Sequence, residues 1–164
     1  MNEKNNQGAV NALLAVYEKA IIELQTVIED IAITDLTAVV DNLTTNSDCR
    51  SIQTILTHVV SAGYSYCIYI RNSKNKNDQR PEKADRLSIV EYKNDLYQVF
   101  KFSCDTLADI HDHELEEPDD AKKIKTSWGK SYDIEQIMEH AIVHVLRHRR
   151  QIERFKNLLI TNRD

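Results

Sequence analysis

Apolar residues recur three and four positions apart along most of the chain, a spacing typical of amphipathic helices. This pattern predicts four long helices and, after the first of them, a short one. The expected ranges, in chain order, are 6–31, 34–40, 49–70, 88–111 and 133–160. Two helices carry start signals: Ser88 and Glu91 are spaced as a capping box, and Gln136 is placed to cap against Asp133. Long polar connections are expected over 71–86 and 111–131.

No stretch between these helices alternates apolar and polar residues as a strand would, and the chain contains only 3 Gly and 2 Pro. β-Sandwiches and Gly-rich nucleotide-binding folds use more turn residues than this. We therefore expect an all-α fold, a four-helix bundle in which residues 1–164 make one domain. Gly63 falls inside a predicted helix, where glycine costs about 1 kcal/mol relative to alanine. We expect a neighbouring backbone to pack closely against it.

The composition is that of a folded protein, since 41% of the 164 residues are hydrophobic and 29% are charged. The net charge of −5 argues against a large phosphate-binding surface, so nucleic acid is not an expected partner. No apolar run reaches the roughly 18 residues of a membrane-spanning helix, and the first residues lack the features of a secretory signal. Cys49, Cys67 and Cys104 form no paired motif, so we expect a cytoplasmic protein without a cysteine metal site.

Three histidines recur every four residues in the last predicted helix: His140, His144 and His148. The second and third occupy its apolar seam, where leucine or isoleucine would be ordinary. Residues four apart lie one above the other on a helix, so these two imidazoles can point at one metal ion. The alternative interpretation is a pair of hydrogen-bonded core histidines, although burying two imidazoles without partners would be costly.

His58 borders the apolar stripe of the helix expected over 49–70. A histidine from a second helix would complete a set of three ligands. Three imidazoles on one side of an ion leave its other side open to water or substrate, which is typical of a catalytic site and not of a closed structural one. Imidazole ligands suit zinc, nickel, iron or copper, and spacing alone does not choose among these metals.

Three segments resemble the DinB/YfiT-like superfamily. HVLRHRRQ at 144–151 is similar to its H-x-x-x-H-R-G-Q motif, ILTHVVSAGYSY at 55–66 to its helix with a Leu-x-His element, and SWGKSYDIEQIMEH at 127–140 to the approach to its last helix. The resemblance implies an up-down four-helix bundle, usually a homodimer, with a divalent ion such as zinc or nickel held by three histidines. By position, the ligands are His58, His144 and His148. Arg150 stands where the family has glycine, at a position expected to face away from the ion.

Other polar residues have weaker assignments. His140 and Gln151 are candidates to orient a ligating imidazole or to face a substrate, and His140 is also a candidate substitute ligand. Glu139 is expected on a solvated helix face. Three further groups are expected to have ordinary surface or packing roles. They are Arg147, Arg149, Arg150 and Arg154 on the last helix, Tyr64, Tyr66 and Tyr69 after His58, and His111 with His113 in an acidic loop. If the tyrosines are functional, we expect them at a pocket mouth or a dimer seam.

The resemblance implies a metal-dependent enzyme acting on a small molecule. Some members transfer a low-molecular-weight thiol such as bacillithiol or mycothiol, one is a mycothiol-dependent maleylpyruvate isomerase, and many others are described as metal-dependent hydrolases. The chain shows no carboxylate at a spacing that identifies a general base. A non-catalytic metal-binding or stress-related dimeric bundle is the alternative, and DNA binding is a third hypothesis that the net charge disfavours.

Overall fold

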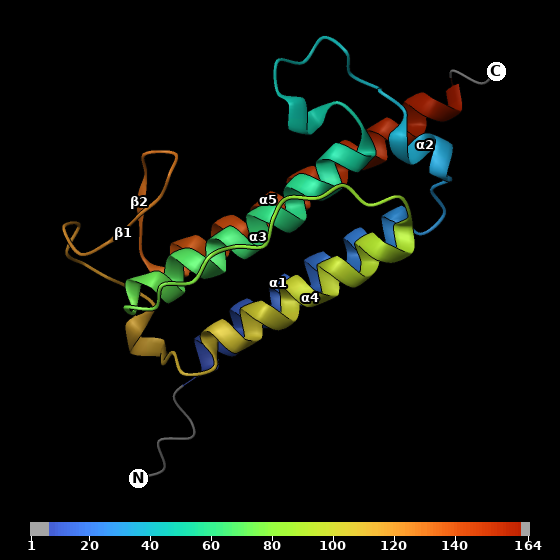
Figure 1. The fold of residues 1–164 in the computed structure, drawn as a ribbon. Helices are drawn as coiled ribbons and strands as arrows, with labels where there is room; N and C mark the ends of the chain where they lie inside the picture. Colours follow the sequence, from blue (N-terminus) through green and yellow to red (C-terminus); the bar gives the residue numbers. More distant parts are fainter. Residues whose placement is uncertain (1–6, 162–164) are drawn as a thin grey trace.

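The computed structural model describes residues 7–161 and is mostly helical, which confirms the all-α class (Figure 1). The first residue of the expected range 6–31 lies outside the described residues. The α-helices are α1 (Gly8–Ile28), α2 (Ile33–Thr37), α3 (Ile52–Ser73), α4 (Ile89–Leu107) and α5 (Ile134–Thr161). Short 3₁₀ turns, η2 (Ser47–Cys49) and η3 (Asp112–Glu114), and an antiparallel pair of two-residue strands, β1 (Ile124–Lys125) and β2 (Ser131–Tyr132), complete the described elements.

The four long helices pack around an apolar core in a defined order. α1 contacts α4 and α5, and α3 contacts the same two helices from the other side. Burial of their apolar faces removes large side chains from water, which is the main stabilising contribution to such a fold. The largest fully buried side chains include Tyr17, Leu24, Ile28, Leu36, Ile52, Ile55, Leu56, Ile70, Tyr92, Leu96, Leu107 and Phe155.

α3 and α4 run in the same direction. Thr57 Oγ1 lies 2.6 Å from Tyr92 Oη near the start of both helices, and Cys67 Sγ lies 3.1 Å from Ser103 Oγ further along both. The strict up-down alternation expected from the family resemblance is therefore not observed at this step. The length of the connection permits this arrangement: α3 has 22 residues and is about 33 Å long, whereas the roughly 15 residues of 74–88 can span about 50 Å.

This return segment, residues 74–88, is tied to α3 and α4 by hydrogen bonds. Gln53 Nε2 donates to the Arg86 carbonyl at 2.9 Å, and Thr57 Oγ1 donates to Asp85 Oδ1 at 2.7 Å. The Arg86 backbone N–H donates to Tyr92 Oη at 3.1 Å. The segment consequently lies along α3 as it runs back toward the start of α4 (Figure 1).

Side-chain caps explain where two helices begin. Ser51 Oγ accepts from the Thr54 N–H and Thr54 Oγ1 accepts from the Ser51 N–H, both at 3.1 Å, so α3 begins at Ile52 and not at residue 49. The predicted cap of α5 is confirmed, because Asp133 Oδ1 accepts from the Gln136 N–H at 2.8 Å and Gln136 Oε1 accepts from the Asp133 N–H at 3.1 Å. α1 and α4 each end before the predicted residue, at Ile28 and Leu107.

The connection 111–131 contains structure that its polar composition did not predict. β1 and β2 form a small hairpin whose turn holds Trp128 and Gly129. Gly129 has φ 79°, a left-handed conformation that glycine adopts without strain. Thr126 Oγ1 closes the turn by donating to the Lys130 carbonyl at 2.8 Å. The hairpin thereby presents Trp128 to side chains of α3 and α5.

Gly63 marks the close approach of helices, but the neighbouring atoms belong to side chains and not to a backbone. A Cβ at this position would lie 2.5 Å from Val99 Cγ1 on α4 and 3.2 Å from Tyr17 Oη on α1. The glycine therefore allows α4 to pack against α3, with a valine in the space that a methyl group would need. The expected contact with a backbone was wrong in this respect.

Gly63→Ala should lower the free energy of unfolding, because overpacking costs about 1–3 kcal/mol and outweighs the roughly 1 kcal/mol that alanine gains in a helix. Urea denaturation would measure the change. In the Val99→Ala background the same substitution should cost at least about 1 kcal/mol less, since the clashing methyl group is gone. A Gly63→Ala protein more stable than wild type would contradict this packing.

Candidate metal centre

Histidines from α3 and α5 meet between the two helices. His58, His144 and His148 each offer a ring nitrogen, and the three nitrogens all lie within 4.8 Å of one another. The Nε2 atoms of His58 and His144 are 2.9 Å apart. Within residues 7–161 this is the single group of three or more potential metal-ligating side chains so arranged. The structure therefore brings together the three residues that spacing and resemblance selected.

The helical spacing of α5 produces the cluster as expected. The rings of His144 and His148 lie one turn apart on its core-facing side, with centroids separated by 4.4 Å. The His58 ring packs against both of them at 4.8 and 5.1 Å. His148 is 5% exposed, whereas His58 and His144 are partly exposed, so the cluster extends from the core toward the surface.

Oxygen atoms hold the outer nitrogens of two of these rings. His58 Nδ1 lies 3.2 Å from Asp48 Oδ2, and His148 Nδ1 lies 3.0 Å from Gln151 Oε1. Because a carboxylate and an amide oxygen accept hydrogen bonds, each Nδ1 carries the proton in the neutral ring. The Nε2 lone pairs of His58 and His148 then point into the cluster. Metal-ligating histidines are commonly oriented in this way by a carboxylate or other oxygen.

The environment also keeps the imidazoles uncharged. Burial, reinforced by the neighbouring imidazoles, lowers the pKa of His144 to about 3. Burial and the nearby His58 lower the pKa of His148 to about 4, against a smaller opposing effect of Gln151. Burial likewise lowers the pKa of His58, although Asp48 opposes it. Neutral imidazole is the form that binds a metal ion.

The donor set fits a metal ion with a small adjustment. Zinc–nitrogen bonds are about 2.0–2.1 Å long, so two ligands of one ion lie at most about 4.2 Å apart. The observed separations of 2.9 Å and up to 4.8 Å bracket the range expected for ligands on one side of an ion. Slight rotation of the rings would bring all three nitrogens within reach. In the protein without an ion, the 2.9 Å between His58 Nε2 and His144 Nε2 is a hydrogen-bond distance, and the His144 N–H can donate to the His58 lone pair.

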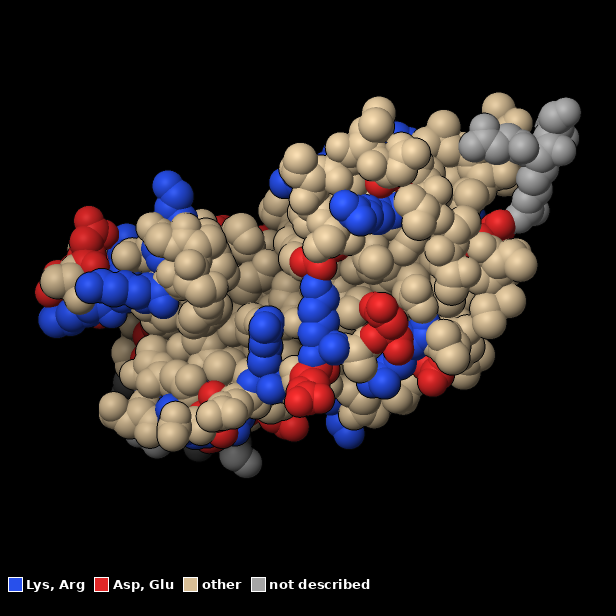
Figure 2. All heavy atoms as spheres, turned by 45° about the horizontal axis from the view of Figure 1, so that its top comes forward, with Lys and Arg blue, Asp and Glu red and all other residues tan. Residues whose placement is uncertain are grey.

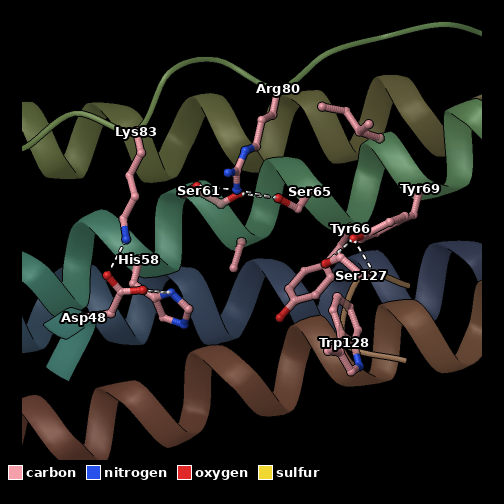
Figure 3. A pocket seen from close by; sticks show the side chains of 12 residues that line it. Asp48, His58, Ser61, Ser65, Tyr66, Tyr69, Arg80, Lys83, Ser127 and Trp128 are labelled. Carbon is pink, nitrogen blue, oxygen red and sulfur yellow. Dashed lines mark hydrogen bonds and ion pairs between the residues drawn. The ribbon is translucent and has the colours of Figure 1, made fainter. Parts of the chain in front are cut away.

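His58 opens the cluster to a surface cleft of about 570 Å³. The cleft runs along α3, between the return segment and the β1–β2 turn (Figure 3). In Figure 2 the surface is hollowed between the hairpin and the bulk of the molecule, with basic side chains near its border. The lining residues are Asp48, His58, Ser61, Ala62, Ser65, Tyr66, Ile68, Tyr69, Arg80, Lys83, Ser127 and Trp128.

Opposite ends of the cleft differ in chemistry. At the end with His58, Asp48 bridges the imidazole and the ammonium group of Lys83. At the other end the Trp128 ring meets the edges of Tyr66 and Tyr69, with centroids 6.1 and 5.6 Å apart. Figure 3 shows the two ends on either side of Arg80, which descends from the return segment. The cleft thus combines a polar end beside the histidine cluster with an aromatic wall.

His140 is not among the three clustered ligands. Its ring centroid lies 6.4 Å from that of His144 and 5.5 Å from that of Trp128, on which it stacks at 21°. Burial lowers its pKa. It therefore stands between the cluster and the aromatic wall, where it supports Trp128 and Tyr66.

The remaining candidates divide between the cleft and the surface. Tyr66 and Tyr69 line the cleft, whereas Tyr64 packs against Phe102. Glu139 is exposed, as expected. Among the arginines, Arg149 pairs with Glu23 on α1 and the others face solvent. His111 and His113 stack on each other, and between them Asp112 accepts hydrogen bonds from the first backbone N–H groups of α1, a structural role.

Residues outside the helical pattern also contribute to the site. Asp48, Arg80 and Lys83 come from segments without periodicity, and Trp128 comes from an unpredicted hairpin. Nothing in their local sequence signals a place beside His58. A search for acids positioned to orient a histidine would have considered Asp48, but its pairing with His58 depends on how residues 38–51 fold back onto α3.

No known protein family matches the chain, and no curated protein matches it in sequence. Its class therefore rests on the fold and the site: an all-α protein with a cluster of three histidines that could hold a metal ion. Over residues 7–161, no helix is both long and apolar enough to cross a membrane.

The metal-free protein should lose stability as the pH falls from about 6.5 toward about 4. The pKa of His148 is lower in the folded chain than in the unfolded chain, so the unfolded state binds the proton first. Between pH 7 and pH 5 this residue should lower the free energy of unfolding by about 2 kcal/mol. Urea denaturation at both pH values should show a correspondingly smaller loss for His148→Leu. His113→Leu, at an exposed position, is the control, and an equal loss in wild type and His148→Leu would contradict the expectation.

Proposed function

We propose that the chain is a metal-dependent enzyme in which His58, His144 and His148 hold a divalent ion such as zinc or nickel. The observation that carries the proposal is the convergence of three neutral imidazoles from two helices beside an open cleft. A closed structural site would use a fourth protein ligand. Here no fourth histidine, cysteine or acid joins the cluster among the described residues, which leaves room for water or substrate.

The positions of the neighbouring side chains support thiol transfer as the reaction. A bound divalent ion lowers the pKa of a coordinated thiol or water and thereby supplies the nucleophile. Among the described residues Asp48 is the single carboxylate lining the cleft, and it is engaged by His58 and Lys83. It is therefore poorly placed to carry a proton to the leaving group of a hydrolysed ester or amide. Transfer of a low-molecular-weight thiol to an electrophile with a stable anionic leaving group needs no such acid.

Hydrolysis of a small-molecule substrate is the second reaction that the same site would support. The proposal includes membership of the DinB/YfiT-like superfamily, a four-helix bundle formed by α1, α3, α4 and α5, and a homodimer in the cytoplasm. The resemblance of the three sequence segments supports the family and the homodimer, the contacts of the helices support the bundle, and the unpaired cysteines support the cytoplasm. A non-catalytic metal-binding bundle is the alternative, in which the ion would join α3 to α5.

Elemental analysis of the purified, tag-free protein tests the metal centre. Wild type should contain about one equivalent of zinc, nickel or a similar divalent ion. His58→Ala and His148→Ala should each lose it, because each removes one of the three ligands from a different helix. His113→Ala should keep it, since this exposed histidine lies outside the cluster.

Absence of metal from wild type, even after reconstitution, would contradict the proposal, as would unchanged metal content in the two ligand variants. Circular dichroism of each variant separates two roles of the ion. A variant that keeps its helical signal has lost a functional ion, whereas a variant that unfolds has lost a structural one.

Thiol transfer can be measured with the metal-loaded protein, bacillithiol or mycothiol, and 1-chloro-2,4-dinitrobenzene. In this reaction a sulfur–carbon bond forms, chloride leaves, and the thiol proton passes to solvent. Loss of the ion in folded His148→Ala should reduce the rate about 100-fold or more. Metal-dependent hydrolysis of 4-nitrophenyl acetate without thiol transfer would favour the hydrolase. Failure of both reactions with fully loaded protein would favour the non-catalytic bundle.

A further inference from the structure

We propose that the cleft binds an organic anion, a small molecule whose carboxylate pairs with Arg80 and whose apolar body lies against Tyr66 and Trp128. This inference deepens the proposed function and rests on it in one respect, namely that the reacting part of the molecule would lie toward His58. The anion site itself depends on residues other than the histidine cluster. Binding of the anion can therefore be tested without the ion, and the anion defines a substrate class for the cleft.

The guanidinium of Arg80 is held by hydroxyl groups of α3. Its Nη1 donates to Ser61 Oγ at 3.1 Å and to Ser65 Oγ at 3.3 Å, which fixes the guanidinium over α3. Among residues 7–161, no carboxylate lies within ion-pairing distance of it. Serine hydroxyls orient a guanidinium but do not balance its charge. The remaining N–H groups can pair with a carboxylate in a bidentate manner.

The backbone around Arg80 is also restrained. Pro81 follows it and limits the preceding residue to extended conformations. On one side of the pair, Arg71 on α3 holds Asp78, and on the other side Thr57 holds Asp85. A side chain supplied by a segment anchored at both ends is better ordered than one on a free loop, so less entropy is lost when a ligand binds.

The charge balance of the cleft opposes that of the whole chain. Within the part of the chain that the structure describes, the lining contains Arg80 and Lys83 against one acid, Asp48, which leaves a surplus of one positive charge. A divalent ion at the histidine cluster would raise this surplus to three. The full chain carries a net charge of −5, so the positive cleft is a local feature that attracts anions. Since Lys83 is already paired with Asp48, Arg80 is the cation of the cleft that has no carboxylate partner among residues 7–161.

The aromatic end of the cleft, away from His58, favours an apolar part in the ligand. Trp128 is 42% exposed and meets the edge of Tyr66, while Ala62 and Ile68 add apolar surface. Figure 3 shows Arg80 between this wall and His58. A cleft of about 570 Å³ is in the size range of small-molecule sites. A molecule with an anionic group and a compact apolar body matches both ends, whereas a neutral polar one would leave the guanidinium unpaired.

The test compares cyclohexylacetate with its neutral analogue cyclohexylacetamide. Trp128 is the only tryptophan of the chain, so its fluorescence reports binding at the aromatic wall, and calorimetry gives the affinity independently. Neither probe absorbs at the excitation wavelength. Wild type, Arg80→Gln and Arg150→Gln are titrated in metal-free and zinc-loaded forms. Arg150→Gln makes the same charge change at an exposed position outside the cleft.

Cyclohexylacetate should bind wild type and Arg150→Gln with the same dissociation constant. Arg80→Gln should bind it about tenfold or more weakly, and the amide should bind wild type weakly to a similar degree. Equal affinity of wild type and Arg80→Gln, equal affinity for acid and amide, or no binding to wild type in either form would overturn the inference. Failure of the metal centre appears separately, as absence of zinc from the loaded samples, and leaves the metal-free comparison valid.

Discussion

The site depends on the burial of three mutually contacting imidazoles between α3 and α5. Neutral imidazoles crowded together without hydrogen-bond partners are costly in a protein interior. Two oxygen acceptors reduce this cost on the outer side: Asp48 at His58 and Gln151 at His148. On the inner side the Nε2 atoms of His58 and His144 lie 2.9 Å apart, and a divalent ion would take the place of the proton between them. The low pKa values of His144 and His148 follow from the same burial, so the groups are neutral under ordinary conditions.

The parallel arrangement of α3 and α4 shapes the surroundings of the cluster. Two parallel neighbours require a connection that returns along the full length of a helix, and residues 74–88 make this return beside α3. The segment delivers Arg80 and Lys83 to the cleft that His58 opens into. The β1–β2 hairpin delivers Trp128 from the other direction. Connections therefore supply much of the cleft, while the helices position the histidines, a division that is common in functional sites.

Residue periodicity was sufficient to predict the helices and the face of α5 that carries His144 and His148, because helical spacing determines which side chains share a side. The participation of His58 could be inferred from its place near an apolar stripe. The direction of α4 could not be predicted, since the length of 74–88 permits either direction and no residue in it selects one. The roles of Asp48 and Arg80 depend on tertiary contacts of irregular segments, for which sequence offers no periodic signal. Domain limits, dimer formation and family membership stay predictions.

The most direct test of the central claim is the X-ray absorption spectrum of the zinc-loaded protein. Three histidines that share one ion should produce imidazole scattering from three nitrogen ligands at about 2.0–2.1 Å. An oxygen or sulfur ligand from outside the protein should add a further contribution. In His58→Ala, which should lose the ion, the signal of three imidazole ligands should disappear. A spectrum with at most one imidazole, or one unchanged by the substitution, would contradict a metal centre shared between α3 and α5.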